Sequence, residues 1–247
     1  MTDPAVSVDL RDGIAEIILD RPEHDNRMSP QMLEELCAAV KALINSSDCS
    51  VMTLRGRGAN FSGGLDLPAI RKARDGFDLA ALRLDLHASL LDSPKPVVAV
   101  LTGYAYAAGA ALALCADFLI AEYNAVLHVP EVNFDSVAFA PWLNVALLAL
   151  KHTESLATRV ALTGQPVDGV ELARLGIATE SVPPGSGAAA GHALAALLAR
   201  NNRDVVAVTK ALITRSRGGL SGRQYLQSQL EQRRLLSATF ERSSDKR

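Results

Sequence analysis

The longest uncharged stretch of the chain, residues 97–116, sets the strongest limit on its fold. These 20 residues contain no Asp, Glu, Lys or Arg, and a helix of that length would cross a bilayer. However, Thr102, Gly103 and Gly109 interrupt the apolar run, and two prolines stand at its start. This composition favours a buried strand followed by a buried helix over a membrane span. We therefore expect a globular α/β protein.

The net charge and the cysteines limit which partners and which cellular compartment we expect for the protein. The formal net charge of −2 provides no overall attraction for nucleic acid or for an anionic membrane. The three cysteines lie far apart without a CxxC pair, which argues against a disulfide framework and for a reducing compartment. Residues 1–20 carry several acids and no apolar segment of the signal-peptide type. We expect a cytoplasmic protein without nucleic-acid or membrane partners.

Strand and helix patterns alternate over roughly the first 130 residues. Alternating apolar residues at 6–10 and 14–19, separated by Asp12-Gly13, predict a β-hairpin. Ser29-Pro30 predicts a helix start, with serine as N-cap and proline at the first helical position. Further strands are expected at 51–54, 97–101, 118–121 and 125–129, and helices at 69–91 and around 108–115.

From residue 141 onward the pattern is nearly all helical. Asp168 is expected to cap a short helix that Gly176 ends. Further helices are expected at 188–200, 204–217 and 221–236, followed by a frayed end at 241–247. This pattern predicts an α/β core over residues 1–185 and a C-terminal helical region over residues 186–247.

Motifs for several other chemistries are missing from the sequence. Gly56-Arg57-Gly58 opens a dinucleotide-binding GxGxxG pattern, but Phe61 stands at the third glycine. The sequence has no GxxxxGK[ST] phosphate loop and no GxSxG nucleophile elbow. Its five histidines are scattered without ligand spacing, so no metal site is expected.

Two glycine- and alanine-rich segments are candidates for binding a ligand through the backbone. Residues 60–67 (Asn-Phe-Ser-Gly-Gly-Leu-Asp-Leu) hold consecutive glycines that allow close approach of a ligand. Residues 102–111 follow a buried strand and open a helix, whose first N–H groups have no acceptor within the helix. Taken singly, a tight turn and the close packing of an alanine-rich helix explain these segments as well.

Glu131 provides a third signal. It follows a strand and precedes Phe134, Phe139 and Trp142, so its carboxylate would be desolvated and its pKa raised. A lone loop glutamate is more often exposed to solvent. In this order, however, the three segments offer two backbone donors and one carboxylate. That is the minimal set for removing a proton next to a thioester carbonyl.

With these segments the sequence resembles the crotonase superfamily, also called the enoyl-CoA hydratase/isomerase family. The matching stretches are Leu19-Asp20-Arg21-Pro22 with Asn26, and residues 61–67, 103–111, 130–131, 161–164 and 173–178. The resemblance implies an α/β fold, a crotonase-like spiral of ββα units, with C-terminal helices that assemble a homotrimer or hexamer. The implied ligand is an acyl-CoA thioester, and no cofactor is implied beyond the coenzyme A of the substrate.

The resemblance also implies roles for single residues. The N–H groups of Leu65 and Ala108 would form the oxyanion hole, and Glu131 would transfer the proton. Hydratases of the family use two glutamates, and the first of these positions falls on Ala111, which cannot titrate. The residues expected to contact the substrate are Arg21, His24, Asp25, Ser62, Gly63, Asp66, Leu67, Phe134, Phe139 and Trp142.

The coenzyme A phosphates lack two of the usual basic partners. Relatives often carry Lys or Arg where this chain has Glu23 and Pro68. The resemblance therefore leaves the phosphates to a neighbouring subunit or to one of the remaining basic residues, which are Arg21, Arg27, Arg71 and Lys72.

A single carboxylate fits a reaction that moves a proton between two carbons. In this the sequence is similar to the Δ3,Δ2-enoyl-CoA isomerases of the superfamily, and residues 138–143 resemble their Ala-Pro-Phe-Trp-Leu segment. The expected reaction converts a 3-enoyl-CoA to a 2-enoyl-CoA. Two alternatives stay open. One is a hydratase or another reaction of the superfamily, with Asp135 or His128 as the second group. The other is an acyl-CoA-binding paralogue without catalysis.

Overall fold

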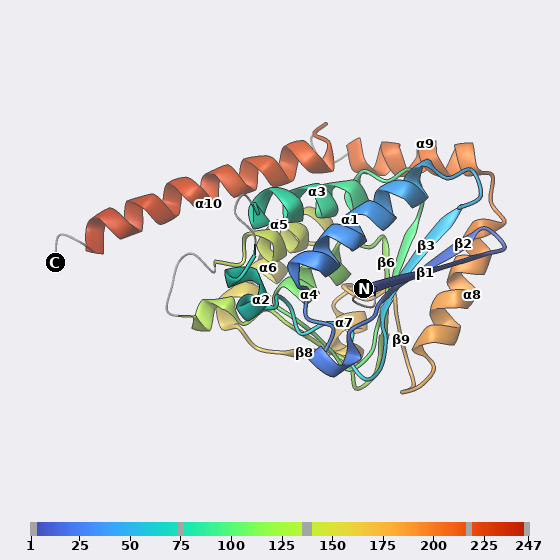
Figure 1. Cartoon of the computed structure of the whole chain (residues 1–247), viewed down its shortest axis with the longest axis horizontal. Coiled ribbons are helices and arrows are strands. Elements are labelled where there is room, and N and C mark those ends of the chain that lie inside the picture. Colours follow the sequence, from blue (N-terminus) through green and yellow to red (C-terminus); the bar gives the residue numbers. More distant parts are fainter. Residues whose placement is uncertain (1–3, 74–76, 135–139, 216–218, 245–247) are drawn as a thin grey trace.

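The computed structural model describes residues 4–73, 77–134, 140–215 and 219–244 and contains, within these ranges, two β-sheets with helices around them (Figure 1). The larger sheet has the strand order β1-β2-β3-β4-β6-β9, and its neighbours are parallel except for the β1–β2 hairpin. Its strands are β1 (Val6–Arg11), β2 (Ile14–Leu19), β3 (Val51–Gly56), β4 (Val97–Leu101), β6 (Phe118–Glu122) and β9 (Glu180–Val182).

The smaller sheet is built from the strands that follow β4 and β6. β4 leads into β5 (Tyr104–Tyr106) and then into helix α4 (Ala108–Leu114). β6 leads into β7 (Val126–His128), which pairs with β5 and with β8 (Val167–Asp168). Chain segments therefore alternate between the two sheets before entering a helix or turn. The predicted α/β class with ββα units is confirmed.

Helices cover both faces of the larger sheet (Figure 1). α8 (Gly187–Ala199) packs against β3 and β4, while α1 (Pro30–Asn45) packs against β1 and β2. Alternate strand residues divide between two cores: Val51 and Val98 join the core beside α8, whereas Met52 and Val97 join the core beside α1. Because β4 is buried on both faces, its sequence is apolar without alternation.

The uncharged segment at 97–116 thus forms β4, β5 and α4, and residues 108–114 are all buried. Across the described part of the chain, no helix is both long and apolar enough to span a membrane. The expectation of a buried strand and a buried helix is confirmed. The short strand β5 between them was not predicted.

Of the remaining helices, α5 packs against α4. Of these helices, α10 packs against α3 and α5, and its C-terminal part projects beyond the rest of the molecule (Figure 1). Their bounds are α2 (Leu67–Arg71), α3 (Leu79–Leu91), α5 (Trp142–Lys151), α6 (Glu154–Thr163), α7 (Gly169–Arg174), α9 (Arg203–Arg215) and α10 (Gly222–Ser244), with 3₁₀ turns η1 (Pro22–His24) and η2 (Glu131–Asn133).

Two expectations about local structure were wrong. The helix predicted at 69–91 is divided into α2 and α3, because Asp78 accepts a hydrogen bond from the Ala81 N–H at 2.9 Å and starts a new helix. The C-terminal part is nearly all helical, as predicted, apart from the short strands β8 and β9, which complete the two sheets. Residues 241–244 continue α10 and do not fray.

The predicted helix caps are confirmed. Ser29 accepts from the Met32 N–H at 3.2 Å, and Asp168 accepts from the Glu171 N–H at 2.8 Å. Gly176 follows α7 with a φ of +71°, the left-handed conformation in which glycine commonly ends helices. The boundary at residue 185 stays a prediction. α8 lies beyond it and packs on the larger sheet.

Candidate active site

The glycine-rich loop at 61–67 is anchored mainly through its backbone. Ser62 pairs with the smaller sheet, because its N–H donates to the Tyr104 carbonyl at 3.0 Å. The Ser62 hydroxyl donates to the Asn26 carbonyl at 2.8 Å and accepts from the Gly64 N–H at 3.2 Å. Ser62, predicted to contact the substrate, is fully buried and outside the cavity lining. Its hydrogen bonds shape the loop.

Gly64 brings this loop against the start of α4. Its φ is +86°, and a Cβ at this position would lie 2.7 Å from the Tyr106 carbonyl oxygen and 3.6 Å from the Ala108 nitrogen. Leu65 and Ala108 line the same cavity. Among the described residues, the N–H groups of Leu65 and Ala108 donate to no protein acceptor. Two unpaired N–H groups at one cavity are the equipment that an oxyanion hole requires.

The start of α4 is held in an unusual conformation. Ala107 has φ +50° and ψ −109°, which L-residues other than glycine rarely adopt. Its N–H donates to the His128 carbonyl at 2.8 Å, and its carbonyl accepts from the Asn144 side chain at 3.1 Å. At Gly109 a Cβ would lie 2.6 Å from the Ser62 carbonyl oxygen. The loop and the start of α4 are thus in close contact.

Glu131 begins the 3₁₀ turn η2, directly after β7 and Pro130. Its Oε1 accepts a hydrogen bond from Asn144 Nδ2 at 2.9 Å, whereas its Oε2 is buried and has no partner. Burial raises the pKa of the Glu131 carboxyl above its usual value, against smaller opposing effects of its own N–H, Arg83 and Asn144. A carboxylate with a raised pKa and a free oxygen is suited to accept a proton.

A cavity of about 130 Å³ connects Glu131 with the loop and with α4. Its wall combines apolar side chains with a few polar groups, the usual character of a small-molecule site. The predicted site residues that line it are Gly63, Leu65, Leu67, Ala108, Glu131, Phe134 and Trp142. Phe139, also predicted, and Asp135, considered as a second acid, lie outside the described residues.

The other predicted substrate contacts lie beside the cavity. Arg21 donates to an Asp66 carboxylate oxygen at 3.1 Å, and Asp66 also caps α2 by accepting from the Ala69 N–H. Asp25 accepts from Asn60 Nδ2 at 3.1 Å. The contacts of Arg21, Asp25 and Asp66 therefore connect η1, the loop and α2.

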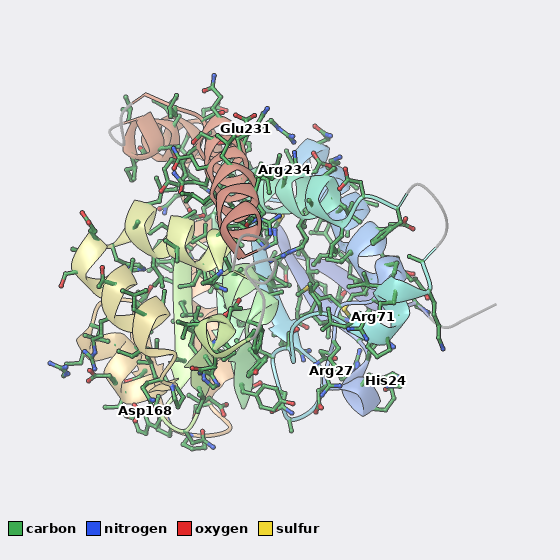
Figure 2. The ribbon with its side chains drawn as sticks, turned by 90° about the vertical axis from the view of Figure 1, so that its left-hand side faces the viewer. His24, Arg27, Arg71, Asp168, Glu231 and Arg234 are labelled. Atoms are coloured by element: carbon green, nitrogen blue, oxygen red, sulfur yellow. The ribbon has the colours of Figure 1, made fainter. Side chains whose placement is uncertain are left out.

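Three further basic residues lie near the same elements. His24 is exposed in η1, and Figure 2 shows it with Arg27 and Arg71 at one edge of the molecule. The Arg27 side chain reaches the loop, because a Cβ added at Gly63 would lie 3.0 Å from its Cγ. Gly63 lines the cavity, so Arg27 stands beside its wall.

The position at which the resemblance places the first hydratase glutamate holds Ala111, which has no acidic group. Ala111 is fully buried in α4, and Glu131 is the one carboxylate among the described residues that line the cavity. His128, considered as a second group, has its Nε2 2.9 Å from the Gly164 carbonyl oxygen and is outside the lining.

Two polar residues of the cavity wall were not predicted. Asn144 of α5 contacts Glu131, and a polar residue at a buried position of the apolar run 142–150 is a signal that would have found it. Arg83 of α3 also lines the cavity. It gives no comparable signal, because an arginine in a helix usually faces solvent.

Comparison with known proteins adds independent information. A family model described as Enoyl-CoA hydratase/isomerase matches residues 9–246. A protein of Thermus thermophilus named putative enoyl-CoA hydratase is 31% identical over 205 residues, which cover 81% of this chain and 80% of the relative. A hydroxycinnamoyl-CoA hydratase-lyase of Pseudomonas fluorescens is 30% identical over 94% of this chain and 86% of its own length.

Solved structures with the same architecture cover nearly the whole chain. The crystal structure of an enoyl-CoA hydratase from Mycobacterium tuberculosis H37Rv superimposes with a TM-score of 0.78 at 28% identity, covering 93% of this chain and 88% of that one. An enoyl-CoA hydratase/isomerase from Xanthobacter autotrophicus Py2 superimposes with a TM-score of 0.83 at 26% identity, covering 93% and 86%. The spiral of ββα units is thus common to these proteins and this chain.

Proposed function

The chain belongs to the enoyl-CoA hydratase/isomerase family, and from this premise we propose that it shifts the double bond of a 3-enoyl-CoA to give the 2-enoyl-CoA. Membership makes it an enzyme acting on acyl-CoA thioesters. The observation that carries the choice of reaction is that Glu131 is the single carboxylate among the described residues of the cavity wall, which also holds the two backbone donors. A single acid–base group suffices to move a proton from one carbon to another.

In the proposed reaction, the thioester carbonyl oxygen accepts hydrogen bonds from the N–H groups of Leu65 and Ala108. Glu131 Oε2 takes a proton from C2, and the electron pair of that C–H bond passes to the carbonyl oxygen as a dienolate forms. Glu131 then returns the proton to C4, which leaves a double bond between C2 and C3. Each donor is expected to stabilise the oxyanion by about 2.7–4 kcal/mol.

The cavity wall supports assignments for the rest of the substrate. Leu67, Phe134 and Trp142 present apolar surface to the acyl chain. The coenzyme A phosphates would meet the guanidinium groups of Arg27 and Arg71, which Figure 2 shows with His24 at one edge of the molecule. Phe139 keeps its predicted role in the acyl pocket. No metal or redox cofactor takes part in the proposed reaction.

Hydration of a 2-enoyl-CoA is the second candidate, and one observation favours it. Asn144 Oδ1 and Glu131 Oε2 are both buried oxygens without a hydrogen-bond partner at the same cavity. A water molecule bound between them would satisfy both and would stand next to the base. The relatives from Thermus thermophilus and Mycobacterium tuberculosis are named hydratases.

An assay with matched thioesters separates these reactions. Purified protein is offered 3-hexenoyl-CoA and 2-hexenoyl-CoA, and formation of 2-hexenoyl-CoA or of 3-hydroxyhexanoyl-CoA is followed by chromatography. We expect turnover of the 3-enoyl substrate and slow or absent hydration of the 2-enoyl substrate. Faster hydration than isomerisation would favour the second candidate. Binding of both thioesters without turnover of either would identify a paralogue without catalysis.

The raised pKa of Glu131 predicts the pH dependence of the isomerase reaction. The base works only when it is ionised, so kcat/KM should fall as the pH falls through the pKa of Glu131 in the free enzyme. Because burial raises this pKa, the midpoint should lie above the usual glutamate value of 4.5. Initial rates with 3-hexenoyl-CoA from pH 4.5 to 8.5 measure it. A midpoint at or below 4.5 would contradict the assignment.

We also propose that the protein is cytoplasmic and assembles as a homotrimer or hexamer. Several apolar side chains on the C-terminal helices are exposed in the single chain, which supports burial between subunits. They are Val205, Val208, Leu212 and Ile213 on α9, and Leu235 and Leu236 on α10.

A further inference from the structure

Arg83 is a charged residue of the cavity wall that the proposed reaction does not use. It belongs to α3, which packs against α1 and α10, and its side chain lines the same cavity as the backbone donors Leu65 and Ala108. Most other side chains of the cavity wall are apolar, among them Leu143 and Trp142 of α5. An arginine in such surroundings needs an acceptor for its five N–H groups.

No such acceptor is provided by the described part of the chain. The Arg83 Nε is buried and has no hydrogen-bond partner, and no ion pair joins its guanidinium to Glu131. Only the main chain of Arg83 is engaged, where its carbonyl oxygen lies 2.6 Å from His87 Nδ1. A buried guanidinium nitrogen without a hydrogen-bond partner is disfavoured, and a ligand bound in the cavity would supply that partner.

The groups around Arg83 do not neutralise it either. His87 and Cys115 are fully buried and uncharged, since burial lowers the pKa of His87 to about 3 and raises that of Cys115 to about 12. Arg233 of α10 adds a second positive charge. Glu131 is the one carboxylate among the described residues whose charge acts on Arg83. The positive charges of Arg83 and Arg233 therefore exceed the negative charge that Glu131 can supply to them.

We propose that Arg83 binds a carboxylate at the far end of the acyl chain, so that the preferred substrates are coenzyme A thioesters of dicarboxylic acids. This inference rests on the proposed acyl-CoA function and names its substrate class. A carboxylate presents two oxygens in one plane, which match the planar fork of a guanidinium. It also supplies the negative charge that the wall lacks. A methyl-terminated chain would leave Arg83 desolvated and unpaired.

Binding of saturated thioesters tests the inference without requiring turnover. Isothermal titration calorimetry at pH 7 compares succinyl-, glutaryl- and adipoyl-CoA with butanoyl-, pentanoyl- and hexanoyl-CoA. The three lengths are needed because the span from the oxyanion hole to Arg83 selects one of them. For the best-fitting length we expect the dicarboxylyl thioester to bind at least about 30-fold more tightly than its methyl-terminated counterpart. The methyl ester of the same dicarboxylyl thioester should lose this advantage.

Two variants connect the preference to one side chain. Arg83→Met should reduce the ratio of dissociation constants to less than about 3-fold, with little change for the methyl-terminated thioester. Arg174→Met removes an arginine that pairs with Glu171 on the surface of α7, and it should keep the wild-type ratio. Thermal unfolding of both variants confirms that they are folded.

The outcomes distinguish this inference from the proposed function. Equal affinities for the two kinds of thioester in the wild type would overturn the inference and leave the acyl-CoA function standing. A preference that survives in Arg83→Met would overturn the role of Arg83. Failure of every thioester to bind would overturn both proposals. A dicarboxylyl preference lost in Arg83→Met supports the inference even if no double bond is shifted.

Discussion

Replacing Glu131 with glutamine is expected to lower kcat for the isomerisation of 3-hexenoyl-CoA by about 10²–10⁴-fold. Glutamine keeps the shape of the side chain, and its oxygen can still accept the hydrogen bond that Asn144 donates to Glu131 Oε1. What it loses is the ability to accept the C2 proton. Because the thioester is held by backbone N–H groups, KM should change little. Steady-state kinetics measure both constants.

The same substitution should stabilise the folded protein at neutral pH. The pKa of Glu131 is raised in the folded state, so the wild type loses stability as the pH rises through the window from the usual glutamate value to that raised pKa. Glutamine has no such loss. The advantage of Glu131→Gln in unfolding temperature should therefore be present above this window and absent below it.

A control for Glu131→Gln is Glu154→Gln in the first turn of α6, where the side chain is exposed. This variant should leave kcat unchanged. If Glu131→Gln retained more than about a tenth of the wild-type kcat, Glu131 would not be the proton-transfer group.

Replacing Gly64 with alanine is expected to lower kcat/KM by about 10²–10³-fold, the size of effect that follows loss of one oxyanion donor. The added Cβ would lie 2.7 Å from the Tyr106 carbonyl oxygen, so the loop must move away from α4. That movement separates the Leu65 N–H from the Ala108 N–H. Kinetics with 3-hexenoyl-CoA measure the loss, and binding of hexanoyl-CoA should weaken less than kcat/KM falls.

Gly176→Ala is the matched control for this substitution. Gly176 also has a positive φ, of +71°, but a Cβ there meets no atom within 4 Å. Both alanine variants therefore carry the backbone strain of about 1–2 kcal/mol, and only Gly64→Ala carries the clash at the cavity. If the two variants lost activity to the same extent, strain alone would explain the result and the oxyanion role of the loop would be wrong.

The sequence predicted those structural elements that are determined by residues close together in the chain. The hairpin at Asp12-Gly13, the cap at Ser29 and the cap at Asp168 depend on residues within one turn of each other, and all three are confirmed. The strands β5, β8 and β9 are short, and their hydrogen-bond partners are distant in the sequence. No local pattern distinguishes such strands from the loops around them, which is why they were missed.

The residues of the candidate site also fall into those that local sequence suggested and those that depend on tertiary packing. Glu131 and the two backbone segments follow strands, so their order in the sequence was enough to suggest a common site. Arg83 and Asn144 reach the cavity from α3 and α5, and their proximity to Glu131 depends on how these helices pack. Ser62 was predicted at the substrate, but its hydroxyl faces Asn26, because the loop needs that hydrogen bond to hold its shape.

The hydrogen bonds that hold the Phe61–Leu67 loop against α4 have a consequence for how such a protein can diversify. The donors proposed to bind the thioester are main-chain atoms, so point substitutions at Leu65 or Ala108 exchange a side chain without deleting a donor. The acid, the amide and the guanidinium instead stand on η2, α5 and α3, each replaceable by a single codon change. Descendants of this chain can therefore acquire new chemistry by altering helix positions, while capture of the thioester is inherited unchanged.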